Sequence, residues 1–370
     1  MLKVYTKNGI ELIDDSSNVQ FHNYEINLDK NLIIDTNNNL AYSINGEFFG
    51  RVLGSESPVP YNDRVLRFTV DPSLDATVKF YIATHHEFTV DWGDSTTDTF
   101  PANPDSIGIY TPEHTYTSTS ATRQVNVMFR SRLEDCNLFY FVNANGVTSI
   151  DSPLPHVSNA TGLINVCKNM ANLTSIPENL FVHNPHITSV SSCFYGCTSL
   201  TTVPDNLLHY VTRITSCNAM FKNSGLSKIP NGFFDTLRNI NTFQETFSGC
   251  INLTSVPENL FRMVSVAKVF TMTFAYCDAL VPNKNIFCDE DTEKDLRFTG
   301  HVASSLRFSQ MFYRTAYTGS GAGEVPRLWE YAVAKSANSA NIRNYCGGTG
   351  NNANSISNYS EVPRNWGGVA

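Results

Sequence analysis

The clearest pattern of apolar and polar positions lies between residues 173 and 287, where one short phrase recurs. Each copy has an apolar residue, two polar residues, an aliphatic residue with proline, two short or polar residues and an apolar pair. The four full copies begin at Leu173, Leu200, Leu226 and Leu253, and a shorter copy contains Val281 and Pro282. The prolines stand at 177, 204, 230, 257 and 282, which are steps of 27, 26, 27 and 25 residues. Such a repeat predicts a stack of similar coils, because one copy alone cannot bury its apolar side.

Two further columns of residues keep step with the repeated leucine. The first lies six residues before it and consists of Phe194, Met220, Phe247 and Phe274. The second lies three residues before it and consists of Met170, Cys197, Cys250 and Cys277, with Asn223 as the exception. An amphipathic helix pair needs apolar residues three and four apart over ten or more residues, whereas Pro, Gly, Asn and Ser interrupt these clusters. The pattern therefore predicts short strands and turns, with a helical turn around Leu180 and Phe181, and one core shared between coils.

Residues 1–58 do not follow the repeat. Apolar stretches between Asn, Asp and Gly predict short strands at Leu2–Tyr5, Asn31–Ile34 and Leu40–Ile44. Gly54–Pro60 has the composition of a linker. We expect this N-terminal β region to serve as an anchor or an oligomer contact, and a small structural domain without a partner is an equally good interpretation.

Residues 61–132 show the alternation of half-buried strands, at Val65–Val70, Val78–Ile82 and Val125–Phe129. Residues 133–146 follow, and within them Leu138–Val142 is apolar enough to be the first strand of a cap on the repeats. We therefore expect the region at 61–132 and the repeats to be docked rigidly on one another.

A short polar turn in this region has a recognisable form. It consists of Trp92, Gly93 and Asp94, and His114 and Tyr116 follow later. Gly93 permits a tight turn, the Asp94 side chain can accept a hydrogen bond from the turn backbone, and Trp92 supplies a large packing anchor. The combination resembles the polycystic-kidney-disease (PKD) type of immunoglobulin-like sandwich, although Ser95 stands where that family often has glycine. The resemblance implies a structural spacer or adhesive unit and no chemistry.

The repeat, in the form Phe-x-Gly-Cys-x-x-Leu-x-x-Ile-Pro-x-x-Leu-Phe, resembles the BspA-like family of bacterial leucine-rich repeats over roughly residues 145–366. The resemblance implies a solenoid with a C-terminal cap over residues 133–370. The next prolines of the pattern are at 326 and 363, so we expect an inserted segment after Pro282. Val147–Ile150 fits an atypical first coil, because terminal repeats must present a polar outer face. The expected fold class is mainly β with short helices: a β region at 1–58, a PKD-like sandwich at 61–132 and the solenoid.

Composition narrows the classes of function. Apolar residues make up 41% and charged residues 16% of the 370, which indicates a folded protein with an uncharged, hydroxyl-rich surface. The net charge of −8 and the lack of a Lys/Arg cluster argue against nucleic-acid binding. No apolar run approaches the ~18–20 residues of a membrane-spanning helix, so we expect no membrane insertion. The N-terminus lacks the apolar stretch of a secretory signal, so we expect none.

Of the nine cysteines, Cys167 and Cys193 recur in one column of the repeat, and Cys197, Cys250 and Cys277 recur in another. Small apolar thiols suit a buried core, so we expect them to be reduced rather than to form a disulfide framework. Only Cys193 and Cys197 have a spacing that suits zinc, and repetition alone explains it. We expect no metal and no cofactor.

Motifs that imitate catalytic or ligand sites are incomplete. Asp289–Asp295 resembles the start of a calcium loop, but Lys294 stands where glycine is required. The glycine-rich stretch 318–324 lacks the Lys-Ser/Thr of a phosphate loop, and His85 and His86 have no cysteine at ligand spacing. No nucleophile elbow is present and the carboxylates are too scattered to nominate a glycosidase pair. We therefore predict that the chain is not an enzyme.

Recognition is the function that remains. The polar pairs between the core leucine and the aliphatic residue form columns, because a solenoid presents the same positions in every coil. They are Thr174, Ser175, Thr201, Thr202, Ser227, Lys228, Thr254 and Ser255, and one residue after each proline come Glu178, Asp205, Asn231 and Glu258. Hydroxyl columns suit hydrogen bonding to a glycan or to a protein of matching spacing. The other interpretations are a merely solvated edge and self-association through sheet edges or cap faces.

The combination of a PKD-like sandwich, BspA-like repeats and a closing Val-Pro-Arg-Asn-Trp-Gly-Gly is similar to proteins of phages of gut Bacteroidales and of their hosts. The resemblance implies a virion structural protein, a head or tail fibre or spike. Residues 1–58 would bind other virion proteins, and the repeats would bind a host surface glycan or protein. A homo-oligomer is also compatible. The alternatives are a BspA-like adhesin on the bacterial cell surface and, less favoured, a glycan-cleaving enzyme.

Overall fold

The computed structural model describes most of the chain beyond residue 64. The described ranges are 5–6, 31–34, 40–44, 47–52, 65–103, 105–129, 136–157, 161–287, 301–315, 323–331, 333–346 and 356–368. The expected linker at 54–60, the acidic stretch 289–295 and most of the glycine-rich stretch 318–324 lie outside them. The chain divides into two compact units, Met1–Asn62 and Asp63–Ala370, and the three-part division stays a prediction. Within the described ranges, no helix has the length and apolar character that a membrane crossing needs.

The described residues of the first unit form one small sheet. Its strands are β1 (Tyr5–Thr6), β2 (Asn31–Ile34), β3 (Leu40–Ile44) and β4 (Glu47–Val52), in that order across the sheet. β1 and β2 are parallel, and the other pairs are antiparallel. The strands expected at Asn31–Ile34 and Leu40–Ile44 are confirmed, and of the one expected at Leu2–Tyr5 only the last residue is described.

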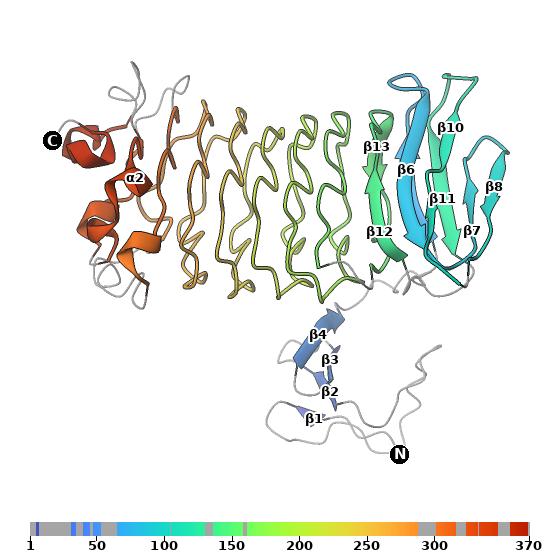
Figure 1. Cartoon of the computed structure of the whole chain (residues 1–370), viewed down its shortest axis with the longest axis horizontal. Helices are drawn as coiled ribbons and strands as arrows, with labels where there is room; N and C mark the ends of the chain where they lie inside the picture. Colours follow the sequence, from blue (N-terminus) through green and yellow to red (C-terminus); the bar gives the residue numbers. More distant parts are fainter. Residues whose placement is uncertain are drawn as a thin grey trace. The chain divides into compact units, whose positions relative to one another are not determined.

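The second unit begins with two sheets packed face to face (Figure 1). Its strands are β5 (Val65–Val70), β6 (Thr77–Thr84), β7 (Phe88–Asp91), β8 (Thr97–Phe100), β9 (Gly108–Tyr110), β10 (Glu113–Thr115), β11 (Arg123–Phe129), β12 (Cys136–Phe141) and β13 (Val147–Ile150). One sheet has the order β13-β5-β11-β7-β8; in the other, β6 pairs with β12 on one side and with β9 and β10 on the other. Alternate residues point into the shared core, where the rings of Phe68 and Phe141 lie 5.1 Å apart.

β12 and β13 belong both to the two sheets and to the beginning of the repeats. β12 is the strand expected as part of a cap, yet it pairs with β6, while the Phe141 N–H donates to the carbonyl oxygen of Val166 at 2.9 Å. β13 pairs with β5, and Ser149 forms a parallel bridge with Ser175 of the next coil. The edges of the two sheets are therefore continued by the coils, which satisfies backbone groups that would otherwise be unpaired.

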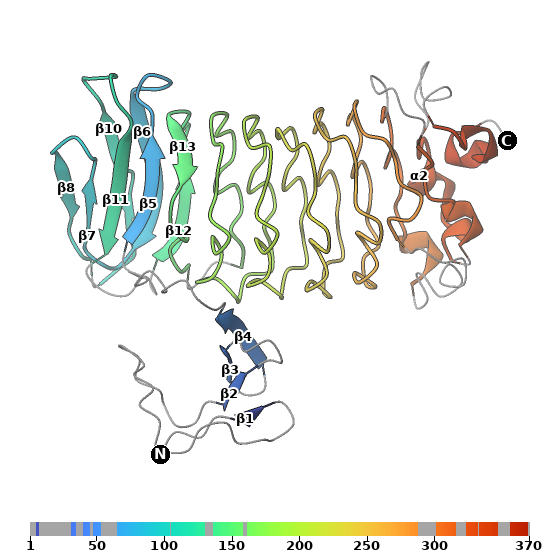
Figure 2. The ribbon, with the colours of Figure 1, turned by 180° about the vertical axis from the view of Figure 1, so that it is seen from behind.

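From residue 161 to 287 the chain forms coils that lie side by side (Figure 1, Figure 2). The described coils contain turns and isolated parallel bridges instead of the short strands that we expected, and Leu180 lies in a turn, in which its N–H donates to the Pro177 carbonyl at 3.2 Å. Alternate N–H groups have different partners: that of Phe194 donates to Met220 in the next coil, and that of Tyr195 donates back to Ser192. The bridges join Gly162, Ser189, Ser216, Thr242, Val269 and Arg307 in successive coils.

The core of the stack contains columns of aromatic rings. One column consists of Phe194, Phe221, Phe247, Phe274 and Phe312, whose successive ring centroids are 5.4, 5.7, 5.5 and 5.5 Å apart. The expected column is thus confirmed for Phe194, Phe247 and Phe274, but assigning Met220 to it was wrong. The segment between Phe221 and Leu226 is one residue shorter than its counterparts, so Phe221 is the stacked ring. For the same reason Ser224, and not Asn223, occupies the cysteine column, where its hydroxyl lies 3.4 Å from the sulfur of Cys250.

Left-handed backbone recurs in two columns along the coils. One column comprises Asn165, Ser192, Ala219, Glu245, Met272, Gln310 and Asn344, and the other comprises Asn169, Gly196, Asn223, Gly249, Tyr276 and Arg314. Asn and Gly adopt this conformation with the least strain. In the second column they alternate for a packing reason, since a Cβ on Gly196 would lie 2.6 Å from the side-chain oxygen of Asn169.

The described helices lie in the C-terminal coils and are short. These are η2 (Ala303–Ser305), η3 (Leu328–Glu330), η4 (Ala334–Ser336), α2 (Ser339–Ile342), η6 (Tyr359–Glu361) and η7 (Arg364–Trp366). The hydrogen-bonded ladder continues through them: the Phe312 N–H donates to Tyr345, and the Tyr345 N–H to Trp366. The architecture is therefore mainly β with few helices, as the sequence predicts.

A buried asparagine fastens the chain near each end of the stack. Asn184 accepts a hydrogen bond from the Val157 N–H at 2.9 Å and donates to the Pro155 carbonyl at 3.1 Å. Asn358 makes the same pair of bonds to the two backbone groups of Val325, at 3.1 and 3.0 Å. These amides supply hydrogen-bond partners to backbone groups near the two ends of the stack.

Candidate binding surfaces

The first member of each predicted polar pair mostly bonds to the preceding coil. The hydroxyl of Thr174 donates to the Thr148 carbonyl at 2.9 Å, that of Ser227 to the Thr201 carbonyl at 3.1 Å, and that of Thr254 to the Ser227 carbonyl at 3.5 Å. Thr201 is the exception, since no side-chain hydrogen bond is formed by it among the described residues. In three of the four coils this hydroxyl therefore serves the stacking of coils, and its proton is already donated.

The second member of each pair is directed to solvent. Ser175, Thr202, Lys228 and Ser255 are all exposed, and within the described residues their side chains make no hydrogen bond or ion pair. The flanking residues Glu178, Asp205, Asn231 and Glu258 are exposed as well. Glu258 accepts a 3.4 Å hydrogen bond from the Asn285 side chain, so the acidic column is partly linked to the next coil. Of the predicted site, this second column offers donors and acceptors to a ligand.

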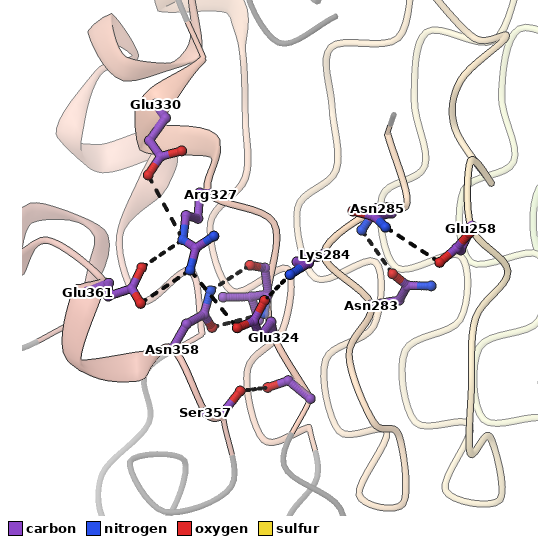
Figure 3. Close-up of polar contacts among 12 residues, drawn as sticks. Glu258, Asn283, Lys284, Asn285, Glu324, Arg327, Glu330, Ser357, Asn358 and Glu361 are labelled. Carbon is purple, nitrogen blue, oxygen red and sulfur yellow. Dashed lines mark hydrogen bonds and ion pairs between the residues drawn. The ribbon is translucent and has the colours of Figure 1, made fainter. Parts of the chain in front are cut away.

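A second polar network lies in the C-terminal coils (Figure 3). Arg327 forms a two-point interaction with Glu361, at 2.7 and 3.2 Å, and also faces Glu324 and Glu330 at 4.0 and 3.9 Å. Lys284, one coil earlier, lies 2.8 Å from Glu324. Hydrogen bonding to Arg327 lowers the pKa of Glu361 and raises the pKa of Arg327. Because the guanidinium sits among three carboxylates, the network joins coils and is not a cation site.

The tyrosines on the outside of the coils were not found by the sequence reasoning. Tyr195 lies under the Lys168 ammonium, 5.1 Å from ring centroid to nitrogen. Tyr276 lies under the Arg314 guanidinium at 5.6 Å and meets the Tyr313 ring edge-on at 5.4 Å. The sequence does contain a signal for Tyr276, because it occupies a repeat position that earlier coils fill with Asn or Gly.

The turn of the sandwich has the structural roles expected of it. Trp92 is fully buried and donates its indole N–H to Asp98 at 2.8 Å, and Gly93 has a φ of +76°. Asp94 accepts from the Thr96 N–H at 3.1 Å and lies 2.8 Å from the ring nitrogen Nε2 of His114. Despite partial burial, these hydrogen bonds to Thr96 and His114 lower the pKa of Asp94. The left-handed φ of +73° at Ser95 explains why glycine would suit that position.

The eight cysteines that the structure describes are buried and free. Burial raises the pKa of the Cys250 thiol to about 11 and that of Cys136 to about 12. Several also donate to backbone, as Cys197 does to the Cys167 carbonyl at 3.0 Å. Protonated, enclosed thiols are poor nucleophiles, so these cysteines act as core residues.

Among the described residues, no group of three or more His, Cys, Asp or Glu side chains could hold a metal ion. His85 lies 3.3 Å from the Asn103 carbonyl, and the His86 N–H donates to the Thr84 hydroxyl. The chain matches no family model, and neither a curated protein nor a solved structure is detectably similar to it. Its function must therefore be argued from its own surfaces.

Proposed function

We propose that this chain is a non-enzymatic structural protein of a bacteriophage particle, a head or tail fibre or spike. In this proposal the coils form a BspA-like leucine-rich-repeat solenoid whose outer wall binds a host glycan or protein. The PKD-like sandwich acts as a spacer and as the first support of the stack. Residues 1–58 attach the chain to other virion proteins.

One observation carries the binding role. Ser175, Thr202, Lys228 and Ser255 stand at the same place in four successive coils, exposed and with side chains uncommitted within the described residues. Neighbouring coils lie at about the spacing of adjacent β-strands, ~4.8 Å. A polymeric ligand with a similar repeat can therefore be contacted by several coils at once, and weak contacts add up.

The state of the cysteines supports assembly inside the bacterial cell. Free, buried thiols in a chain of this size are typical of proteins that fold in a reducing compartment. Phage particles assemble in the cytoplasm and leave by lysis, so a virion protein needs no oxidative folding.

The binding role is tested with a double variant, Thr202→Lys and Ser255→Lys, which places bulky cations in the second column. We expect adsorption of the purified chain to host cells to fall at least tenfold, with an unchanged melting temperature. Thr236→Lys is the matched control, because Thr236 is an exposed hydroxyl residue elsewhere in a coil. Adsorption that survives the double variant would reject the second column as the binding surface.

The virion role is tested separately by mass spectrometry of purified particles. We expect the chain in the particles, and we expect a chain that lacks residues 1–58 to be soluble but absent from them. Detection in the host cell envelope without particles would instead identify a bacterial adhesin. Release of reducing sugar from host polysaccharide by the purified chain would contradict the non-enzymatic role.

A further inference from the structure

A group of side chains on the outside of the last regular coils has the composition of a sugar subsite. Tyr276 is 38% exposed, its ring lies 5.4 Å from that of Tyr313, and the Arg314 guanidinium lies 5.6 Å from its centroid. Arg314 also forms an ion pair with Asp278 at 3.5 Å. Two aromatic rings and two planar polar groups therefore lie together at one place on the surface.

The backbone conformation of Tyr276 is one that favours asparagine or glycine over tyrosine. Its φ is +61°, in a column that the four preceding coils fill with Asn169, Gly196, Asn223 and Gly249. A tyrosine is strained in this conformation where asparagine is not. Long side chains such as Met272 and Arg314 also occupy left-handed positions, so the strain alone does not identify a site. What identifies it is strain together with an exposed aromatic ring and its polar neighbours.

The coil before contributes an apolar neighbour. Ile251 follows the core residue Cys250 as Asp278 follows Cys277, so the two occupy the same position of adjacent coils. Ile251 is 58% exposed, one of the most exposed large aliphatic side chains of the stack. The surface around Tyr276 thus combines apolar area with hydrogen-bonding groups, as a pyranose ring itself does.

The charges select the class of ligand. Asp278 offsets the positive charge of Arg314, so the site as a whole is close to neutral. A free anion would meet the Asp278 carboxylate, whereas an uncharged polyol gains from both a planar donor and a planar acceptor. The C–H face of a pyranose can pack against the Tyr276 ring, in the way that apolar groups pack on aromatic faces.

We propose that Tyr276, Tyr313, Arg314 and Asp278 form a subsite for an uncharged pyranose residue of a bacterial surface polysaccharide. This inference rests on the proposed function and names the ligand class for the wall of the coils. It places the strongest contact at Tyr276, several coils away from Thr202.

The test is binding of the full chain to a microarray of neutral and anionic bacterial surface polysaccharides, for the natural protein and for Tyr276→Asn. Asparagine is the residue that the coils of Asn169 and Asn223 use at this position. We expect at least a tenfold loss of binding to the neutral polysaccharides, with a melting temperature that is unchanged or higher. Tyr195→Asn is the matched control, because Tyr195 is an outer tyrosine with a cation above its ring and an ordinary backbone. We expect this control to retain binding.

The outcomes separate this inference from the proposed function. Binding of neutral polysaccharide that survives Tyr276→Asn, or is lost equally in Tyr195→Asn, overturns the subsite and leaves glycan binding in place. A lower melting temperature with intact binding shows that Tyr276 has a structural role, and also overturns it. Binding of anionic polysaccharides alone overturns the ligand class. If the chain binds no polysaccharide but adsorbs to host cells through a protease-sensitive receptor, the subsite fails while host binding stands. Failure of every form of adsorption contradicts both.

Discussion

The sandwich and the coils are both held together by backbone hydrogen bonds between neighbouring segments, but the bonds are arranged differently in the two regions. In the sandwich, β5 and β11 pair over six residues, and alternate side chains point inwards. In the coils, pairing of this kind is confined to short segments such as residues 192–197, where every second N–H donates within its own coil and the others donate to the next coil. The sandwich therefore depends on a few large anchors in the core between its two sheets, whereas each coil depends mainly on its two neighbours. We therefore expect a core substitution to destabilise the whole sandwich, whereas in the coils it should destabilise mainly the neighbouring coils.

The largest effect is expected from removing the anchor of the sandwich. Trp92 is fully buried, and its ring centroid lies 6.2 Å from that of Phe80. Its backbone carbonyl accepts a hydrogen bond from the Tyr116 hydroxyl. Trp92→Ala should lower the free energy of unfolding by about 3–5 kcal/mol. Hydrogen exchange should speed up across all of β5, β7 and β11. Protection from hydrogen exchange that is lost only around residue 92 would contradict the expectation that the whole sandwich is destabilised.

The counterpart in the coils is Phe247→Ala, in the stacked aromatic column. The local cost should again be about 3 kcal/mol. Here, however, hydrogen exchange should speed up in the coils of Phe221 and Phe274 and much less in the sandwich. Phe247→Leu is the control, with a smaller loss in the same coils. Equal loss of protection at β11 would show that the two regions unfold as one.

An intermediate effect is expected at the junction between the two regions. Asn184→Ala leaves the Val157 N–H and the Pro155 carbonyl without their partner, and an unsatisfied buried polar group costs about 1–3 kcal/mol. Asn358→Ala gives the comparison at the other end of the stack. Urea unfolding measures both, and a change below the error of the fit at Asn184 would show that the junction does not depend on this amide.

A smaller loss is expected where the coil backbone is left-handed. Gly249 has a φ of +75°, and an added Cβ would collide with the side-chain oxygen of Asn223. Gly249→Ala should cost about 1–2 kcal/mol for the backbone alone. Ala219→Gly removes a Cβ at a φ of +51° and should leave the melting temperature unchanged or higher. A stabilising Gly249→Ala would show that the coil can change conformation at this turn.

The smallest effect is expected from acid at the C-terminal network. Its hydrogen bond with Arg327 lowers the pKa of Glu361 below the ordinary value of 4.5, so the ionised carboxylate stabilises the fold above that pH. This contribution is lost as the pH falls through the lowered value, and it is small because the pair is exposed to solvent. Glu361→Gln should therefore lower the melting temperature slightly at pH 7 and leave it unchanged at pH 2. An equal fall in melting temperature at pH 7 and at pH 2 would show that the charge of Glu361 does not contribute to stability.

Much of the repeat could be predicted from the sequence, because its period can be read from the spacing of prolines and apolar residues alone. The stacked Phe194, Phe247 and Phe274, and the roles of Trp92, Gly93 and Asp94, follow from patterns that local chemistry imposes. The assignment failed at Met220, because the sequence shows that this step is one residue shorter, but only the stacked rings show where the residue is missing. Of the candidate site, the columns were predicted but not the commitment of the first hydroxyl to the preceding coil.

The amino-acid sequence by itself determined the period, the inward columns and the polar outer positions, since these depend only on the spacing of apolar residues. The tertiary structure decided which polar residues remain available, because a hydroxyl or amide is committed only when a carbonyl of another coil is within reach. It also decided that β12 and β13 serve two neighbours at once, and that Tyr276 holds a strained backbone beside Arg314. Those contacts join residues many positions apart, and no local pattern encodes them.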